Sequence, residues 1–203
     1  LDITDGGSVY VVGSTFGNAS FGNGVTVTGL GYDMYLVKYN AQGEAQWAQR
    51  GGSTSWADKG ASVDVGPYGE LYVGGHIFGA NATFGNITVS ASDQRDAYIA
   101  KYDTNGTAMW VETQETDGNA SVVDLAADDS GNVFALTQFT DTITIDTFTF
   151  NGAGGFAYAY AITKYDSSGA VLWSKEVETA NSYGGPSINT VYRGYGGGDV
   201  DST

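Results

Sequence analysis

The chain contains no cysteine, only two prolines and a single histidine. The absence of cysteine excludes disulfide bonds, thiolate catalysis and cysteine-ligated metals. It also argues against a small eukaryotic secreted domain, which is usually stapled by disulfides. So few prolines, with no long polar tract, argue against disorder, and no apolar run approaches the ~18 residues of a membrane-spanning helix. We therefore expect a folded chain without a membrane span.

Basic residues are also scarce, since 8 lysines and arginines stand against 23 acidic residues and give a net charge of −15. Such a chain repels phosphate backbones and anionic membrane surfaces, so we expect no nucleic-acid partner. The charge fits a protein kept soluble outside the cell, or one that meets cations. No signal peptide is visible, and the chain begins at Leu1 in what reads as mid-strand. We expect a processed product of a longer precursor, extracellular or at the cell surface.

What the sequence has in abundance is glycine, with 31 residues, together with β-branched and aromatic residues typical of strands. One segment occurs three times at steps of 63 residues: KYNAQGEAQW from Lys38, KYDTNGTAMW from Lys101 and KYDSSGAVLW from Lys164. A catalytic group is usually needed once. Repetition at this spacing indicates a structural unit.

The rest of each unit repeats as well. SVYVVGSTFG from Ser8 matches ELYVGGHIFG from Glu70 and NVFALTQFTD from Asn132. Each unit holds four or five short alternating segments, separated by Gly, Asn and Asp turns about every ten residues. The pattern predicts an all-β protein of three tandem four- to five-stranded antiparallel sheets. The predicted units are residues 1–61, 62–122 and 123–186.

These motifs resemble the bacterial β-propeller repeat called SBBP. The likeness rests on the VYVVG strand, the F-G pair, and the DMYLVKY segment followed by a glycine and a tryptophan. The third unit departs from it, since Ala159 replaces the aspartate and Thr137 replaces a strand glycine. The resemblance implies a propeller-like fold in secreted or cell-surface proteins of mostly unassigned activity. It supplies no catalytic residues.

The repeated motif has a structural interpretation. We expect its glycines to take the positive-φ corner of a hairpin, its tryptophans to pack between neighbouring sheets, and its lysines to lie along the sheet and pair with acidic groups. Stacking of a ligand on the tryptophans is the alternative. The motif residues are Lys38, Tyr39, Gly43, Trp47, Lys101, Tyr102, Gly106, Trp110, Lys164, Tyr165, Gly169 and Trp173.

Three units fall short of the 4–8 blades of a closed propeller. Residues 187–203 read as an incomplete fourth unit with a glycine-rich tail. Three explanations remain open: a fragment of a longer array, a permuted closure, or a subunit that completes its sheet with a neighbour. Strand addition at an open edge, repeated head to tail, builds filaments. We expect a homo-oligomer or filament joined through the chain termini and open sheet edges, with residues 187–203 as an intersubunit strand.

Little in the sequence indicates catalysis. His76 is alone, and no serine elbow accompanies it, so we expect a structural histidine and no enzyme. Glu112, Glu115 and Asp117 form a carboxylate cluster of the kind that glycoside hydrolysis needs. In a chain with 23 acidic residues, a solvated surface is the simpler interpretation.

No cofactor is expected. Calcium is the one metal considered, since hard cations prefer several oxygen ligands, and turn-forming aspartates are the alternative. The calcium candidates are Asp124, Asp128, Asp129, Asp199 and Asp201.

Five N-x-S/T sequons occur, all in predicted turns or strand ends where a glycan could be accommodated. Turns rich in Asn, Gly and Thr also produce sequons by chance. The candidate asparagines are Asn18, Asn81, Asn86, Asn105 and Asn119.

The sequence thus predicts a non-catalytic extracellular structural or assembly protein. The alternative is a lectin-like propeller that holds glycans on loops rich in tyrosine and tryptophan. That alternative predicts exposed aromatic residues at equivalent places in each unit.

Overall fold

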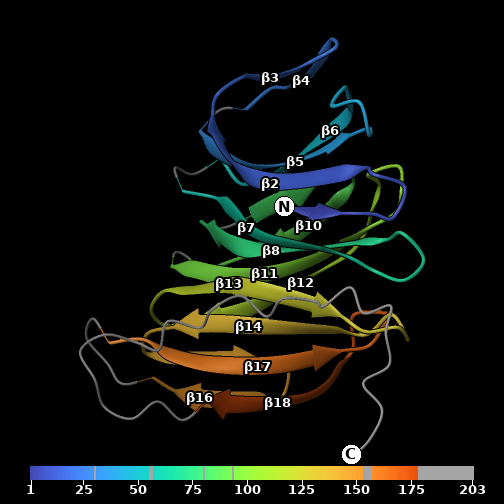
Figure 1. The fold of residues 1–203 in the computed structure, drawn as a ribbon. Helices are drawn as coiled ribbons and strands as arrows, with labels where there is room; N and C mark the ends of the chain where they lie inside the picture. Colours follow the sequence, from blue (N-terminus) through green and yellow to red (C-terminus); the bar gives the residue numbers. More distant parts are fainter. Residues whose placement is uncertain (30, 55–56, 80, 93, 153–156, 178–203) are drawn as a thin grey trace, which may run out of the picture.

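The computed structural model describes residues 1–29, 31–54, 57–79, 81–92, 94–152 and 157–177. These residues form eighteen antiparallel β-strands, which are arranged as a stack of three blades (Figure 1). The predicted all-β, propeller-like architecture is confirmed, and the blades form an open stack in the described part of the chain. No helix in the described part of the chain is long and apolar enough to cross a membrane. The predicted fourth unit, residues 187–203, lies outside the described residues.

Each blade is built from four strands of its own unit, and each unit also carries a two-stranded hairpin between its second and third blade strands. Blade 1 is β1 (Asp2–Ile3), β2 (Val9–Phe16), β5 (Tyr32–Tyr39) and β6 (Ala45–Gly52), with hairpin β3 (Ala19–Gly22) and β4 (Val25–Val27). Blade 2 is β7 (Lys59–Val65), β8 (Leu71–Phe78), β11 (Arg95–Tyr102) and β12 (Ala108–Thr116), with hairpin β9 (Asn81–Phe84) and β10 (Ile87–Ser90). Blade 3 is β13 (Ala120–Ala127), β14 (Val133–Phe139), β17 (Ala159–Tyr165) and β18 (Val171–Val177), with hairpin β15 (Thr142–Ile145) and β16 (Phe148–Asn151).

The hairpins do not stay with their own blade. Strand β9 of the second unit pairs with β6 of the first, and β15 of the third unit pairs with β12 of the second. Two of the blade sheets therefore have six strands and the third has four, where the sequence predicts four or five, while β3 and β4 form a two-stranded sheet of their own. The prediction missed this exchange because alternation within a strand does not show which sheet the strand joins.

Blade boundaries in the structure follow the strands. β7 begins at Lys59 and β13 at Ala120, so the unit boundaries placed after residues 61 and 122 fall inside these first strands. The first strand of blade 1 is much shorter, because β1 pairs with only two residues of β2, whereas β7 pairs with six residues of β8. Along the edge of β2 that faces β1, most residues have no strand partner among the described residues.

The turn between the last two strands of each blade has a local cause. The Oδ1 atom of Asp103 accepts hydrogen bonds from the backbone N–H groups of Asn105 and Thr107, and Asp166 makes the same contacts 63 residues later. A glycine then takes a positive φ, with 79° at Gly43, 82° at Gly106 and 93° at Gly169. Only glycine adopts this conformation without strain, which explains its recurrence.

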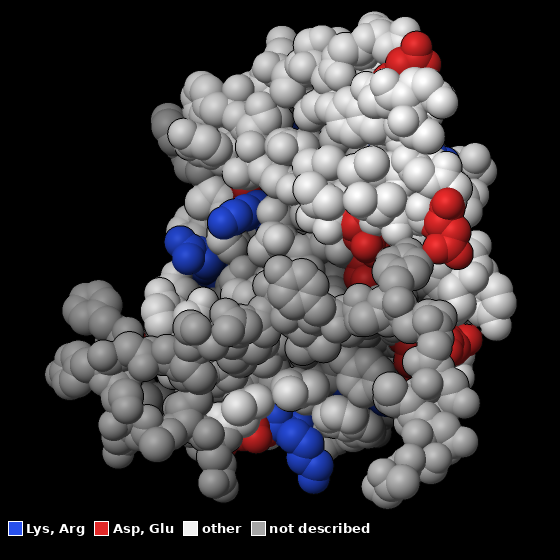
Figure 2. Space-filling view, viewed as in Figure 1, with Lys and Arg blue, Asp and Glu red and all other residues white. Residues whose placement is uncertain are grey.

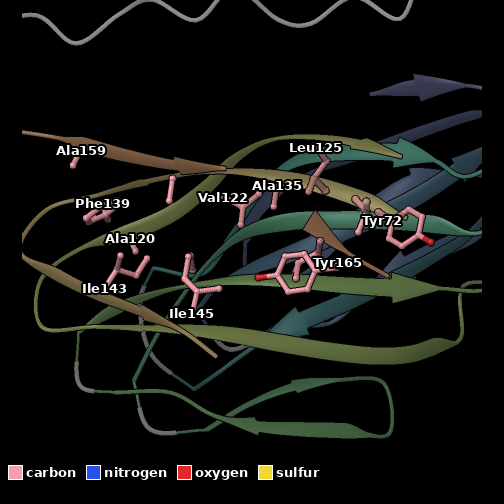
Figure 3. Close-up of a cluster of buried hydrophobic side chains, with 14 of the residues drawn as sticks. Tyr72, Ala120, Val122, Leu125, Ala135, Phe139, Ile143, Ile145, Ala159 and Tyr165 are labelled. Atoms are coloured by element: carbon pink, nitrogen blue, oxygen red, sulfur yellow. The ribbon is translucent and has the colours of Figure 1, made fainter. Parts of the chain in front are cut away.

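The blades pack face to face through two apolar clusters. One joins Met34 and Leu36 of blade 1 to Leu71 and Tyr98 of blade 2. The other lies between blades 2 and 3 and contains side chains from Tyr72 on β8 to Tyr165 on β17 (Figure 3). Both faces of blade 2 are consequently buried, which accounts for its nearly continuous apolar strands.

At equivalent positions of the two interfaces, the large side chain comes from the first blade in one case and from the second blade in the other. Between blades 1 and 2, a Cβ atom on Gly60 would collide with the side chain of Val12. Between blades 2 and 3 the arrangement is reversed, because a Cβ atom on Gly74 would collide with Val122. Close-packed interiors tolerate a residue swap of this kind when the total volume is kept.

This compensation leads to a prediction. Gly74→Val should lower the free energy of unfolding by roughly 1–3 kcal/mol through overpacking against Val122. The double variant Gly74→Val/Val122→Gly reproduces the packing seen between blades 1 and 2, and should recover most of that loss. Urea denaturation of the three proteins measures both effects. A double variant less stable than Gly74→Val would contradict the proposed compensation.

Candidate functional site: the two open faces of the blade stack

Inside the stack, each blade holds a turn of the next one. Lys101 Nζ and Trp110 Nε1 of blade 2 both donate a hydrogen bond to the carbonyl oxygen of Ser167, at 3.2 Å each. Ser167 lies in the glycine turn of blade 3, and a Cβ on Gly169 would stand 3.1 Å from the Trp110 ring. The turn thus lies flat on the indole because glycine has no side chain. We call this contact the turn latch.

A glycine turn also lies on a tryptophan between blades 1 and 2. A Cβ atom on Gly106 would lie 3.0 Å from the ring of Trp47. Next to this tryptophan, Lys38 Nζ lies 5.4 Å from the centroid of the Tyr10 ring, within the range of a cation–π interaction. Tyr10 and its counterparts are latch residues that the sequence motif did not single out, because they lie about thirty residues before the KY segment.

At each end of the stack, one half of the turn latch has no partner among the described residues. Gly43 is exposed with no atom within 4 Å of a built Cβ, whereas Gly106 and Gly169 are buried. At the other end, Lys164 and Trp173 stand beside Phe134, as their counterparts stand beside Tyr10 and Tyr72. No turn covers this group among the described residues. One end therefore presents a free turn, and the other presents a free tryptophan.

The hairpin exchange is also open at one end. Phe84 of β9 is fully buried, because it packs on Tyr98 of its own blade and fills the space over Gly51 of blade 1. Phe21 of β3 packs in the same way on Tyr35, with 4.9 Å between ring centroids, but its outer side is only half-buried. Hairpin β3–β4 has no preceding blade to join in the described structure (Figure 1).

Burial of the blade faces shows the same contrast. Leu36 and Ile99 are fully buried, while Ile162 at the equivalent place on blade 3 is 37% exposed. Val73 is fully buried in blade 2, and its counterpart Val11 on blade 1 is only half-buried. The stack therefore ends in two apolar faces, one on blade 1 and one on blade 3.

Two of the motif lysines form ion pairs with acidic groups of their own blade. Lys101 Nζ lies 3.5 Å from Glu70 Oε1, and Lys164 Nζ lies 3.3 Å from Asp128 Oδ2. Hydrogen bonds from Asn132, together with Lys164, lower the pKa of Asp128 to about 2. Asp128 also accepts hydrogen bonds from the backbone N–H groups of Ser130 and Asn132, so it closes its own turn.

The other calcium candidates are dispersed. Asp124 accepts hydrogen bonds from Ser62 and from the backbone of Leu125, and Asp129 is exposed. Asp199 and Asp201 lie outside the described residues. Among the residues that the structure describes, no three acidic or histidine side chains are placed to hold one metal ion.

The predicted carboxylate cluster is partly assembled. A groove of about 580 Å³ runs between the outer strand of blade 2 and blade 3, and its lining includes Glu112, Glu115 and Asp146 but not Asp117. Desolvation, followed by the charge of Asp146, raises the pKa of Glu112. Both glutamates are exposed, in keeping with the solvated-surface interpretation. Asp146 was not singled out because it follows β15, in the hairpin that crosses between blades.

All five sequon asparagines are exposed in the structure, so a glycan at any of them would extend into solvent. Asn81 lies at the start of β9 and Asn86 in the turn that follows it. Asn105 lies in the glycine turn of blade 2, close to the latch with Trp47. The positions leave the predicted modification open.

His76 lies at the end of β8 on the face turned toward blade 3, with Nδ1 3.2 Å from Ser121 Oγ. Burial lowers the pKa of His76 to about 4, and the nearby charges of Arg95 and Lys59 contribute. The ring is therefore neutral at physiological pH. Neither Ser121 nor the two cations could be associated with His76 from sequence spacing, since they come from three other strands.

The turn latch leads to a stability prediction. Trp110→Ala removes a ring that packs under Gly169 and a hydrogen bond to Ser167, and should lower the free energy of unfolding by roughly 2–3 kcal/mol, less than for a fully buried tryptophan. Trp173→Ala should cost distinctly less in the isolated chain, because no described turn covers Trp173. Chemical denaturation of both variants compares them directly. Equal losses would count against the latch.

His76 leads to a prediction on pH. Because its pKa is lower in the folded chain than the ordinary 6.5, the unfolded chain binds the proton first. This contribution to stability is intact above pH 6.5 and is lost as the pH drops toward 4, where the loss reaches about 3 kcal/mol. His76→Gln places a glutamine at this position, as blade 3 has at Gln138. The free energy of unfolding of this variant should not show the fall between pH 6.5 and 4 that His76 causes in the wild type. A parallel pH dependence of the two proteins would contradict the assignment.

No family model matches the chain. It is 27% identical over 112 residues to an uncharacterized WD repeat-containing protein of Acanthamoeba polyphaga mimivirus, over 52% of this chain and 8% of that protein. It is 29% identical over 102 residues to the regulatory protein FlaEY of Caulobacter vibrioides, over 48% of this chain and 10% of that protein. The chain thus spans about a tenth of the length of the curated relatives it matches. Together with the stacked sheets, these similarities support a β-repeat protein of propeller type.

Proposed function

We propose that this chain is a non-catalytic, extracellular structural module of SBBP-type β-propeller repeats, and that it self-associates by stacking blade 1 of one copy on blade 3 of the next. One observation carries the proposal. In the described part of the chain, a glycine turn lies on a tryptophan at both internal interfaces, and the two halves of this contact are open at opposite ends of the stack.

The geometry of the contact follows from the internal interfaces. In a second copy, the carbonyl of Ala41 corresponds to that of Ser167, and would accept hydrogen bonds from Lys164 and Trp173 of the first. The free turn at Gly43 would then cover the Trp173 indole. Because different surfaces meet, the contact is heterologous, and its repetition gives a ring if the rotation closes and a filament if it does not.

The face on blade 3 differs from the internal faces in two respects. Asp2 and Asp64 each accept a hydrogen bond from a backbone N–H of the next blade, at Val65 and Ala127 respectively, whereas blade 3 has Ala126 in this register. The hydroxyl of Tyr72 donates to Gly131 of blade 3, but Phe134 occupies the equivalent position without a hydroxyl. Contact between copies therefore rests on apolar packing and the turn latch.

The size of the interface sets its strength. Blade 3 has four strands about 4.8 Å apart and seven or eight residues long, which cover roughly 20 by 25 Å. The first strand of blade 1 has only two residues, so the two faces together contribute at most about 1,000 Å². This is near the lower limit for a specific protein interface. Assembly should accordingly depend on protein concentration.

A second function is favoured by one observation. Tyr32, the first residue of β5, and Tyr158, just before β17, occupy equivalent positions, and each is 48% exposed. Beside Tyr32, the ring of Phe16 lies 5.2 Å away and is 60% exposed. These rings offer a stacking surface for a sugar, as the lectin-like alternative predicts. Arg95 replaces the tyrosine in the second unit, so the surface is not repeated throughout.

The proposed assembly is tested by light scattering with negative-stain imaging across protein concentrations. Wild-type protein should form concentration-dependent oligomers. Ile162→Glu should abolish them by placing a charge in the blade 3 face. Met109→Glu makes the same change on blade 2, at a side chain that is 56% exposed and belongs to neither end blade, and should assemble as wild type does.

A mixing experiment distinguishes the two faces. Val11→Glu blocks the blade 1 face only, and Ile162→Glu blocks the blade 3 face only. Each variant alone should be monomeric, while an equimolar mixture should form dimers and nothing larger, because one intact pair of faces remains. A monomeric wild-type chain at high concentration would refute the proposal, as would full assembly of both variants.

A further inference from the structure

A group of basic side chains lies apart from the turn latch, at one end of blade 2. We call Lys59, His76 and Arg95 the basic cluster. Lys59 is the lateral partner of His76, and His76 is the partner of Ala97, so these residues share one face of the sheet. Arg95 precedes Ala97 by two residues and lies on the same face. Figure 2 shows basic side chains next to one another over the ends of β7, β8 and β11, with most acidic side chains of this view on the other side.

The basic cluster has no acidic partner in the described structure. The ion pairs among the described residues join Arg50 to Asp33, Lys101 to Glu70 and Lys164 to Asp128. Neither Lys59 nor Arg95 takes part in one, although acidic residues outnumber basic residues 23 to 8. The Nε atom of Arg95 is buried and has no hydrogen-bond partner. Two cations and an imidazole thus stand together without an ion-pair partner among the residues that the structure describes.

Blade 3 closes the other side of the basic cluster. Ser121 of β13 places its hydroxyl 3.2 Å from His76 Nδ1. Arg95 forms an isolated β-bridge with Asn119, just before the same strand. Hydroxyl, imidazole, guanidinium and ammonium groups therefore meet where the two blades join.

The basic cluster is not required by the repeat. The residues equivalent to His76 are Ser14 and Gln138, and those equivalent to Arg95 are Tyr32 and Tyr158. The turn latch, by contrast, keeps its glycine and tryptophan in all three units. Blade stacking thus proceeds without these basic side chains in the other two units.

From this arrangement we infer that the basic cluster binds a tetrahedral oxyanion, the sulfate or phosphate group of a small molecule or of a larger partner. The planar guanidinium of Arg95 offers paired donors that match two oxygens of such a group, and Lys59 adds a compact positive charge. The hydroxyl of Ser121, which donates to the Val122 carbonyl in the structure, lines the site from blade 3 and would turn its proton to the ligand. The negative charge of the whole chain repels anions at long range, so binding should depend on these direct contacts.

His76 is the only histidine of the chain, which makes its ring protons a specific probe. The experiment records their NMR signals at neutral pH while inorganic phosphate or sulfate is added at constant ionic strength, with chloride and acetate as the balancing salts. A saturable shift with phosphate or sulfate, and none with chloride or acetate, is expected. The ratio of the phosphate and sulfate affinities indicates which ester the site prefers.

Matched variants complete the test. Arg95→Gln should weaken the oxyanion affinity at least about tenfold, as expected for the loss of a charge-assisted pair of hydrogen bonds. Lys175→Gln removes one positive charge from the distant strand β18 and should leave the affinity unchanged. The inference is overturned if no anion gives a saturable shift, if chloride gives the same curve, or if Arg95→Gln binds as wild type does. Circular dichroism verifies that both variants are folded.

Discussion

A tryptophan of one blade lying under the glycine turn of the next is the contact on which this structure depends. A flat sheet of four strands cannot bury both of its faces alone, so each blade needs a neighbour. Apolar packing between faces has little directional preference. The turn latch adds direction, because the Ser167 carbonyl receives hydrogen bonds from Lys101 and Trp110 at the same time. It therefore fixes how far one blade is displaced and rotated relative to the other.

The exchanged hairpins reinforce the same connection at the outer edge. β9 extends the sheet of blade 1, and β15 extends that of blade 2, so consecutive units share a hydrogen-bonded sheet as well as an apolar interface. Phe84 shows how closely the two are coupled, since it belongs to one unit by sequence and fills the space above Gly51 of another. At the blade 1 end of the described stack, both a blade face and a hairpin consequently lack a neighbouring unit. Self-association would use the same contacts that already hold the units together.

Where the three units differ, the differences have separate meanings. Val12 packs on Gly60 at one interface, and Val122 packs on Gly74 at the other. This exchange of the large and the small residue preserves the packing between blades. Loss of the carboxylate at Ala126 and of the hydroxyl at Phe134 alters only the last face, which makes it more apolar than the internal ones. The basic cluster around Arg95 is found in one unit alone and has no counterpart in the stacking of the others. Repetition thus identifies the scaffold, and departures from repetition identify candidate sites.

The sequence by itself determined the all-β class, the three units and the turns, because these depend on local chemistry: alternation along a strand, and a glycine that must adopt a positive φ at Gly43, Gly106 and Gly169. It could not determine that each hairpin joins the preceding blade, since β-pairing between segments far apart leaves no periodic signal in either one. It also could not place Ser121 beside His76, because these two residues meet only through the stacking of blades 2 and 3. Contacts within a unit follow from short-range patterns, whereas contacts between units depend on the rotation and displacement of whole sheets, which only the tertiary structure decides.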